Sequence, residues 1–135
     1  GDGGALDYNA RPNFGEVTLR SGFTPDPRVV DLSAGGNIDA AQQIDGCQGH
    51  VTRAPDVRLN YTAGSLPLII SAFSNADTTL IVNAADGNWY CDDDSEGLNP
   101  RVRFNDPQSG RYEIWVGTYS GGGSQAAELH ISEIR

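Results

Sequence analysis

Short apolar stretches separated by turn-forming residues recur along almost the whole sequence, and this pattern constrains the fold more than any other feature. Residues 57–61 alternate, so that Val57, Leu59 and Tyr61 share one face of an extended strand. Residues 66–73 are apolar on both faces, which predicts a strand in the middle of a sheet. The other strands are predicted at residues 15–20, 28–32, 78–82, 101–104, 112–116 and 128–134.

Helical patterns are nearly absent. Only residues 38–44 have a helix-friendly composition, and that segment is short. About eight to nine short strands joined by turns, without crossover helices, predict an all-β fold that is an antiparallel β-sandwich or jelly roll. Residues 1–14 are expected to be an N-terminal extension or linker, and residues 15–135 to form a single domain.

The charge balance restricts the classes of partner. The sequence has 18 acidic and 9 basic residues, for a net charge of −9, and every basic residue is arginine. Such a surface repels nucleic acid and anionic membranes, whereas it suits cations. No apolar run approaches the roughly 18–20 residues that a membrane span needs. The sequence begins at Gly1 without a basic, hydrophobic leader, so we expect any signal peptide to have been removed or to lie outside it.

The two cysteines, Cys47 and Cys91, are 44 residues apart and lack the spacing of a zinc site. In an acidic, turn-rich chain without lysine we expect them to form one disulfide, the alternative being two buried free thiols. A disulfide indicates an oxidising compartment, so the protein is expected to be secreted, periplasmic or at the cell surface.

A run of acidic residues is the strongest local signal for chemistry. Asp92, Asp93 and Asp94 are consecutive, and clustered carboxylate oxygens are the ligands that Ca²⁺ prefers. Asp77 precedes the predicted strand 78–82 and Asp86 follows it, so both are expected to approach the same ion. The spacing is not that of an EF-hand loop. The alternative is a solvated acidic turn whose carboxylates cap turn amides.

Signals for catalysis are weak. The two histidines are His50 and His130, and His130 is predicted on an outward strand face without a carboxylate partner. The sequence has neither a G-x-S-x-G elbow nor an H-E-x-x-H motif. A pair of carboxylates can act on a glycosidic bond, but adjacent aspartates on a turn favour a metal site or a structural role. The chain is therefore expected not to be an enzyme.

Three aromatic residues are candidates for ligand binding. Trp115 and Tyr119 are predicted on the face opposite the core-facing residues of strand 112–116, and Trp89 lies two residues before Cys91. Exposed aromatic side chains on a sandwich can stack on sugars or line peptide grooves. The alternative is a tryptophan that packs against the disulfide or in a second layer of the core.

Several of these segments together resemble the bacterial pre-peptidase C-terminal domain family. The segments are 77–83 (DTTLIVN), 86–94 (DGNWYCDDD), 99–100 (NP) and 107–117 (PQSGRYEIWVG). They are similar to the family's D-x-x-L strand, D-G turn, acidic turn with a following asparagine, and closing G-x-Y-x-x-x-V strand. The resemblance is clear over about residues 65–120 and extends over about 22–135.

The resemblance implies a jelly-roll-like β-sandwich of a secreted bacterial protein. Such domains are usually non-catalytic appendages of proteases and other hydrolases, and the collagen-binding domains of clostridial collagenases bind calcium and a fibrous substrate. The resemblance adds Asn99 to the expected calcium ligands Asp77, Asp86, Asp92 and Asp93. The disulfide and the third aspartate, Asp94, are not general features of the family, and the chain contains no protease domain.

The combined hypothesis is a secreted, non-catalytic, calcium-binding β-sandwich module for extracellular recognition or stabilisation. Its expected partner is an extracellular polymer or protein. The first alternative is a metal-free structural or interaction domain, and the second is a small carboxylate-dependent hydrolase.

Overall fold

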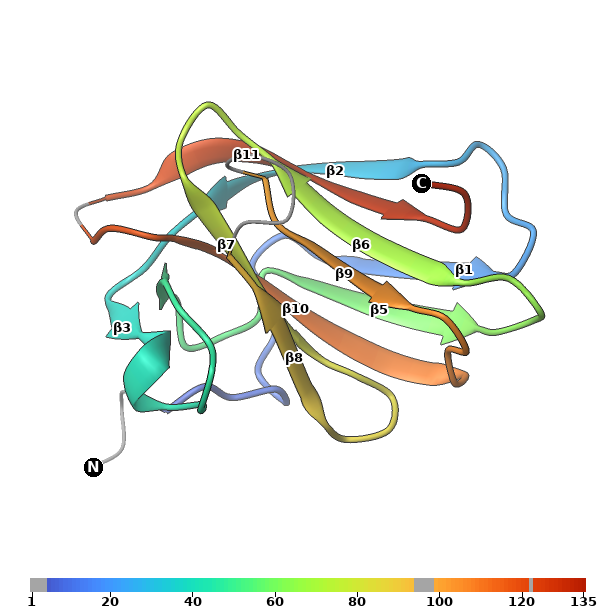
Figure 1. Cartoon of the computed structure of the whole chain (residues 1–135), viewed down its shortest axis with the longest axis horizontal. Helices are drawn as coiled ribbons and strands as arrows, with labels where there is room; N and C mark the ends of the chain where they lie inside the picture. The colour runs from blue at the N-terminus through green and yellow to red at the C-terminus, as the bar shows by residue number, and fades with distance from the viewer. Residues whose placement is uncertain (1–4, 94–98, 122) are drawn as a thin grey trace.

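The computed structural model describes residues 5–93, 99–121 and 123–135, and these residues form two sheets packed face to face (Figure 1). The described strands are β1 (Glu16–Arg20), β2 (Arg28–Ala34), β3 (Ile38–Asp39), β4 (His50–Val51), β5 (Val57–Thr62), β6 (Leu68–Phe73), β7 (Thr78–Asn83), β8 (Trp89–Asp92), β9 (Arg101–Phe104), β10 (Gly110–Thr118) and β11 (Gln125–Ser132). One 3₁₀-helix, η1 (Ala40–Gln42), joins β3 to the segment before β4. No helix in the described part of the chain is long and apolar enough to cross a membrane.

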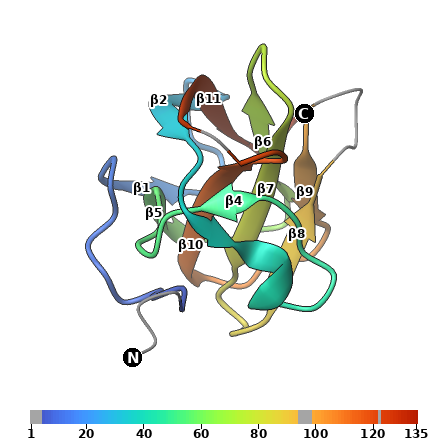
Figure 2. The same cartoon turned by 90° about the vertical axis from the view of Figure 1, so that its left-hand side faces the viewer.

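The first sheet, called sheet A, is built around β10. Its main order is β1-β5-β10-β7-β8, and the short strand β4 pairs with the far end of β10 and with β3. The second sheet, called sheet B, has the order β2-β11-β6-β9. All pairings in the described residues are antiparallel except that of β1 with β5. The predicted all-β sandwich is therefore confirmed, and Figure 2 shows it from the end that carries β3, η1 and β4.

The main core lies between the two sheets, and the strand alternation of the sequence generates it. Val57 and Leu59 are fully buried and Tyr61 is nearly so, as their spacing predicts. On β10, Tyr112, Ile114 and Val116 point into the same core. Burying an aliphatic side chain of this kind contributes about 1.5–3 kcal/mol each, so these strands supply much of the driving force for folding.

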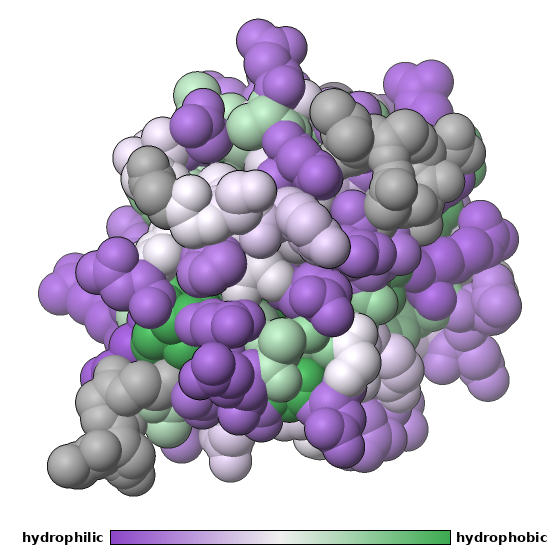
Figure 3. Space-filling model, turned by 60° about the vertical axis from the view of Figure 1, so that its left-hand side comes forward, coloured by the Kyte–Doolittle hydropathy of each residue, from purple (hydrophilic) through white to green (hydrophobic). Residues whose placement is uncertain are grey.

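A second, smaller core covers the opposite face of sheet A. Trp115 and Ile81 are fully buried there, beneath a cap formed by η1, β4 and the chain between them. The disulfide between Cys47 and Cys91 fastens this cap to β8, with the two Cα atoms 5.5 Å apart. Closing a loop of this length stabilises the fold by about 4 kcal/mol on the chain-entropy model. Around the cap the surface is mainly hydrophilic, as Figure 3 shows.

Three short strands were not predicted: β3, β4 and β8. The helix-friendly segment 38–44 instead gives β3 followed by η1, whose N-cap Asp39 accepts a hydrogen bond from the Ala41 amide at 3.1 Å. Strand β8 contains the start of the acidic run, so its sequence gave no strand pattern. It forms by antiparallel pairing with β7, in which Ile81 lies opposite Cys91.

Residues 7–14, which lie within the expected extension or linker over residues 1–14, are bonded to the sandwich. The Asp7 amide donates to the Arg53 carbonyl at 2.9 Å, and the Asp7 carboxylate pairs with the Arg53 guanidinium at 3.0 Å. The Phe14 amide donates to the Asp56 carbonyl at 2.7 Å. Backbone and side-chain bonds of this kind place the segment along sheet A.

A buried carboxylate holds this segment in place. Glu113 is 1% exposed, and its Oε2 accepts from Arg58 Nε at 2.6 Å and forms an ion pair with Arg111 Nε at 2.7 Å. Arg58 also donates to the Ala10 carbonyl at 2.9 Å, and Arg111 donates to Asn9 Oδ1 at 2.7 Å. Burial raises the pKa of Glu113, while its hydrogen bond and charge interaction with Arg58 oppose that rise.

A second buried carboxylate fills the gap alongside β10 between the end of β4 and the start of β5. Asp56 is 1% exposed, and its Oδ2 accepts from the Val116 amide at 2.8 Å. Its Oδ1 accepts from Asn13 Nδ2 at 3.0 Å. Desolvation raises the pKa of Asp56 to about 6, against the opposing effect of these two hydrogen bonds. The bond from Val116 satisfies a backbone amide that the interrupted sheet would otherwise leave unpaired.

We predict that Arg58→Ala lowers the free energy of unfolding by about 3–5 kcal/mol, because it leaves Glu113 buried with one cationic partner fewer. It also removes the donor to the carbonyl of Ala10, so amide hydrogen exchange over residues 7–10 should accelerate. Denaturant unfolding and hydrogen exchange measure the two effects. Arg20→Ala, which removes the same charge at an exposed site, is the control. Equal losses in the two variants would contradict the role of Arg58.

We predict that Asp56→Asn flattens the pH dependence of stability between about pH 4 and pH 6. The folded state holds the Asp56 proton more tightly than the unfolded state, because its pKa is raised. The stabilising contribution of the protonated group is full below the unfolded pKa and is lost as pH rises through about 6. At pH 7 the variant should be the more stable protein by up to about 3 kcal/mol, and near pH 4 the two should be similar.

Urea unfolding at several pH values tests this expectation. Asp45→Asn makes the same charge change at an exposed position and should leave the pH profile of the wild type unchanged. A profile for Asp56→Asn that stays parallel to the wild type would show that Asp56 does not titrate differently in the folded state.

Candidate functional site

Three of the expected calcium ligands lie at one end of the sandwich. Leu80 of β7 pairs with Asp92 of β8, and the two strands are antiparallel. Asp77, which directly precedes β7, therefore lies at the end of the sheet where β8 finishes with Asp92 and continues to Asp93. Sequence reasoning placed these residues on neighbouring strand ends, and the register brings them to the same end.

Asn99 lies at the same end, where the chain passes from sheet A to sheet B. Asp92 Oδ2 accepts from the Arg101 amide at 2.9 Å, which connects the end of β8 to the start of β9. The Asn99 side-chain oxygen accepts from the Ser74 amide at 3.4 Å, in the turn that leads to Asp77. The β6–β7 turn and the two ends of the β8–β9 connection are therefore neighbours. We call the group Asp77, Asp92, Asp93 and Asn99 the acidic end.

Asp86, another of the expected ligands, lies away from the acidic end. It lies in the turn between β7 and β8, at the opposite end of β8 from Asp92. Its carboxylate accepts from the hydroxyl of Tyr90 and, at 2.9 Å, from the amide of Asn88. The hydrogen bond from Tyr90 is the main reason that the pKa of Asp86 is lowered. Asp86 thus stabilises its own turn.

The acidic end supplies oxygen ligands of the kind that hard cations prefer. Asp94, also an expected ligand, lies outside the described residues. Within residues 5–93, 99–121 and 123–135, no three His, Cys, Asp or Glu side chains already lie close enough to hold a metal ion. Ca²⁺ takes six to eight oxygens, so carbonyl groups or water would have to complete its shell.

The two histidines lie on different sheets, His50 on β4 and His130 on β11. His130 is on the outward face of sheet B, as predicted, but it is not free of partners. Its Nε2 lies 3.0 Å from Glu128 Oε1, and its ring contacts that of Phe73 with centroids 4.5 Å apart. His130 also lines a groove, which strand alternation alone did not indicate.

The three candidate ligand-binding aromatics have different positions. Trp115 is fully buried in the second core, so it is not a surface ligand contact. Trp89 is partly buried, and its ring lies 5.3 Å from that of Trp115 and 6.3 Å from that of Tyr8, centroid to centroid. Tyr119 is 49% exposed, and its amide donates to the Asp77 carbonyl at 2.9 Å beside the acidic end.

Sequence reasoning missed the groove on the outward face of sheet B. Its residues Ser71 and Phe73 alternate with Leu68, Ile70 and Ala72 of β6, which point into the core. The presence of one polar and one aromatic residue on the second face of a predicted central strand was the available signal.

The fold is similar to that of a solved pre-peptidase C-terminal domain. The pre-peptidase C-terminal domain of a collagenase from Bacillus anthracis matches with 17% identity and a TM-score of 0.55, over 92% of this chain and 100% of that one. PliG, a periplasmic inhibitor of g-type lysozyme from Aeromonas hydrophila, matches with 11% identity and a TM-score of 0.44, over 87% of this chain and 96% of that one. No protein-family model and no curated protein matches the sequence.

The first match confirms the resemblance to pre-peptidase C-terminal domains that the sequence motifs indicated. At this level of identity the match establishes the shared fold, and function has to be argued from the residues of this chain.

Proposed function

We propose that this chain is a secreted, non-catalytic β-sandwich module that binds Ca²⁺ at the acidic end and serves in extracellular recognition. The observation that carries the proposal is the position of Asp77, Asp92, Asp93 and Asn99 at the same end of the sandwich. The disulfide between Cys47 and Cys91 supports an oxidising compartment.

Electrostatics favour a cation at this end. Like charges about 4 Å apart repel by about 1 kcal/mol in water and by more where they are partly buried. The carboxylates of Asp77, Asp92 and Asp93 are all half-buried, in a chain whose net charge is −9. A divalent cation would turn this repulsion into attraction. Mg²⁺ would do so less well, because it needs near-octahedral geometry and gives up its water reluctantly.

The position of the acidic end gives the ion a structural role. Asp92 ends a strand of sheet A, whereas Asn99 leads into β9 of sheet B. An ion held between them would tie the two sheets together at the end opposite the β7–β8 turn. Such a tie would stabilise the module outside the cell.

A recognition role is favoured over hydrolysis by how the carboxylates are held. One oxygen of Asp92 already accepts from the Arg101 amide, and Asp93 follows directly in the bend after β8. A glycosidase needs two carboxyl groups that face the same bond across about 5–9.5 Å. The arrangement suits ligation and capping better than acid–base catalysis.

We predict that millimolar Ca²⁺ raises the melting temperature by about 5–10 °C relative to chelator, since a ligand at a hundredfold excess over its Kd adds about 2.7 kcal/mol of stability. Mg²⁺ should raise it less. The double variant Asp77→Asn/Asp93→Asn should lose the response to Ca²⁺. Differential scanning calorimetry measures all of these effects.

Asp86→Asn is the matched control, because it makes the same kind of change at the other end of β8. It should keep the full response to Ca²⁺. An unchanged melting curve for the wild type in Ca²⁺ and in chelator would contradict the calcium proposal and favour the metal-free interaction domain. Loss of the response in Asp86→Asn alone would indicate that the ion binds beside Asp86, at the other end of β8, and would contradict the proposed site.

A further inference from the structure

A row of three polar side chains crosses one end of sheet A. Thr118 of β10 pairs with Thr78 of β7 on one side and with His50 of β4 on the other. Thr78 is fully buried and Thr118 is 5% exposed. Among the described residues, Thr78 Oγ1, Thr118 Oγ1 and His50 Nδ1 have no hydrogen-bond partner. Threonines that face each other across two strands can bond to each other. Two adjacent buried hydroxyls that bond to nothing therefore need an explanation.

A pocket of about 170 Å³ lies beside this row. The residues that line it are Ala76, Asp77, Thr118, Ser120, Gly121, Gly123 and Gln125. The Tyr119 amide donates to the Asp77 carbonyl at 2.9 Å, which holds the β6–β7 turn against the end of β10. The ring of His50 lies next to Gly121, where an added Cβ would be 3.4 Å from Nε2. The buried row and the pocket are therefore neighbours.

The pocket offers hydrogen-bond acceptors and one negative charge. Asp77 is half-buried and is the single charged side chain among the lining residues. Its carboxylate has no hydrogen bond or ion pair within the described part of the chain, and the same holds for the side chains of Ser120 and Gln125. Together with Thr118 Oγ1, these groups have their bonding capacity available for a ligand.

We propose that this pocket binds a primary ammonium group on an alkyl chain, of the kind that a lysine side chain carries. An ammonium group has three donors and no acceptor. One donor would pair with the Asp77 carboxylate, one with Thr118 Oγ1, and the third with the Ser120 hydroxyl or the Gln125 amide oxygen. The proposal rests on the recognition role proposed above and does not require the calcium ion. The sequence has no lysine, so no side chain of a second copy could supply the group.

The acceptors fit an ammonium group better than other cations. A guanidinium is a planar fork with five donors that matches a carboxylate in a bidentate pair, whereas an ammonium is a compact point charge. A compact pocket with one carboxylate and separate neutral oxygens matches the point charge. Ca²⁺ takes six to eight oxygens and binds more tightly as more carboxylates contribute, which a pocket with one carboxylate does not provide.

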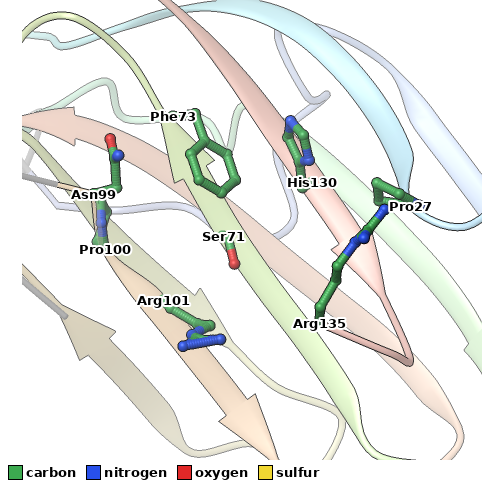
Figure 4. A pocket seen from close by; sticks show the side chains of 8 residues that line it. All are labelled: Pro27, Ser71, Phe73, Asn99, Pro100, Arg101, His130 and Arg135. Atoms are coloured by element: carbon green, nitrogen blue, oxygen red, sulfur yellow. The ribbon is translucent and has the colours of Figure 1, made fainter. Parts of the chain in front are cut away.

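The larger groove on the outward face of sheet B does not suit this ligand. It measures about 410 Å³ and is lined by both Arg101 and Arg135. In Figure 4 these two side chains lie on either side of the Ser71 hydroxyl. Two guanidinium groups would repel an ammonium group. An amine should therefore bind at the end of the sandwich and not in the groove.

The test is an NMR titration of the isotope-labelled chain with four probes. They are Nα-acetyl-lysine methylamide, the same compound acetylated at Nε, Nα-acetyl-arginine methylamide and n-butylammonium. Asp77 also belongs to the acidic end, so every titration contains chelator. We expect the capped lysine and n-butylammonium to shift the amides of Asp77, Thr118 and Gly121, with affinities in the millimolar range because one ammonium group makes few contacts. The Nε-acetylated compound should give no shift.

The two binding probes distinguish the possible sources of the ammonium group. Tighter binding of the capped lysine than of n-butylammonium would assign the pocket to a polypeptide partner. Equal binding would assign it to a free amine, and both results support an ammonium pocket.

Two variants test the assigned contacts. Asp77→Asn should weaken the binding more than tenfold, and Thr118→Val should weaken it roughly tenfold, because each removes a bond to a charged group. Thr118→Val keeps the side-chain shape and removes an unpaired buried hydroxyl, so it should not lower the melting temperature. Thr79→Val is its matched control, since Thr79 is also buried with an unpaired hydroxyl but faces the other side of β7. Asp31→Asn, at an exposed position, controls for charge.

Four outcomes would contradict the proposal. Equal weakening by Thr79→Val or Asp31→Asn would mean non-specific attraction, and equal shifts with the Nε-acetylated compound would remove the role of charge. Tighter binding of the capped arginine would assign the pocket to a guanidinium. No shift with any probe would leave the hydroxyls to ordered water. Because chelator is present throughout, these results are independent of the calorimetric response to Ca²⁺, so failure of one proposal is distinguishable from failure of the other.

Discussion

Burial of β10 on both faces is the constraint on which the rest of the structure depends. One face of this strand packs Tyr112, Ile114 and Val116 into the core between the sheets, and the other presents Trp115 and Glu113. A sandwich of two sheets covers only the first face. Without other segments to cover it, the second face would leave Trp115 exposed and the carboxylate of Glu113 without its cationic partners. The disulfide-fastened cap covers Trp115, and the N-terminal segment together with Arg58 and Arg111 covers Glu113.

Much of the fold could be predicted because it follows from local alternation. The inward positions of Val57, Leu59 and Tyr61, and the opposite orientation of Trp115, can be read directly from strand periodicity. Strand β8 could not be predicted in this way. The acidic run interrupts its alternation, and the strand forms by pairing with β7. The docking of residues 5–14 depends on hydrogen bonds from Arg58 and Arg111, far along the chain, which no local pattern reports.

The candidate sites show the same division. Asp77 and Asp92 could be placed together from sequence, since both adjoin the ends of neighbouring strands. Asp86 could not be separated from them until β8 was known to be a strand, because only its length puts that residue at the far end. The groove on sheet B depends on the registers of β11, β6 and β9, which bring Arg101 beside Ser71. No local sequence pattern around Ser71 or Arg101 indicates that the two residues are neighbours.

The fold thus assigns different tasks to different parts of one rigid sandwich. Sheet A is covered on both faces and supplies stability, whereas the groove lies on the outward face of sheet B. The acidic end lies where the chain crosses from one sheet to the other, and it shares Asn99 with the groove, so a bound ion there would stiffen the connection beside the groove.

Anomalous diffraction from crystals equilibrated with Ca²⁺ tests the central claim most directly. The account predicts an anomalous peak at the acidic end, within about 2.3–2.6 Å of carboxylate oxygens of Asp77, Asp92 or Asp93. A peak beside Asp86, or no peak at the acidic end at saturating Ca²⁺, would contradict it.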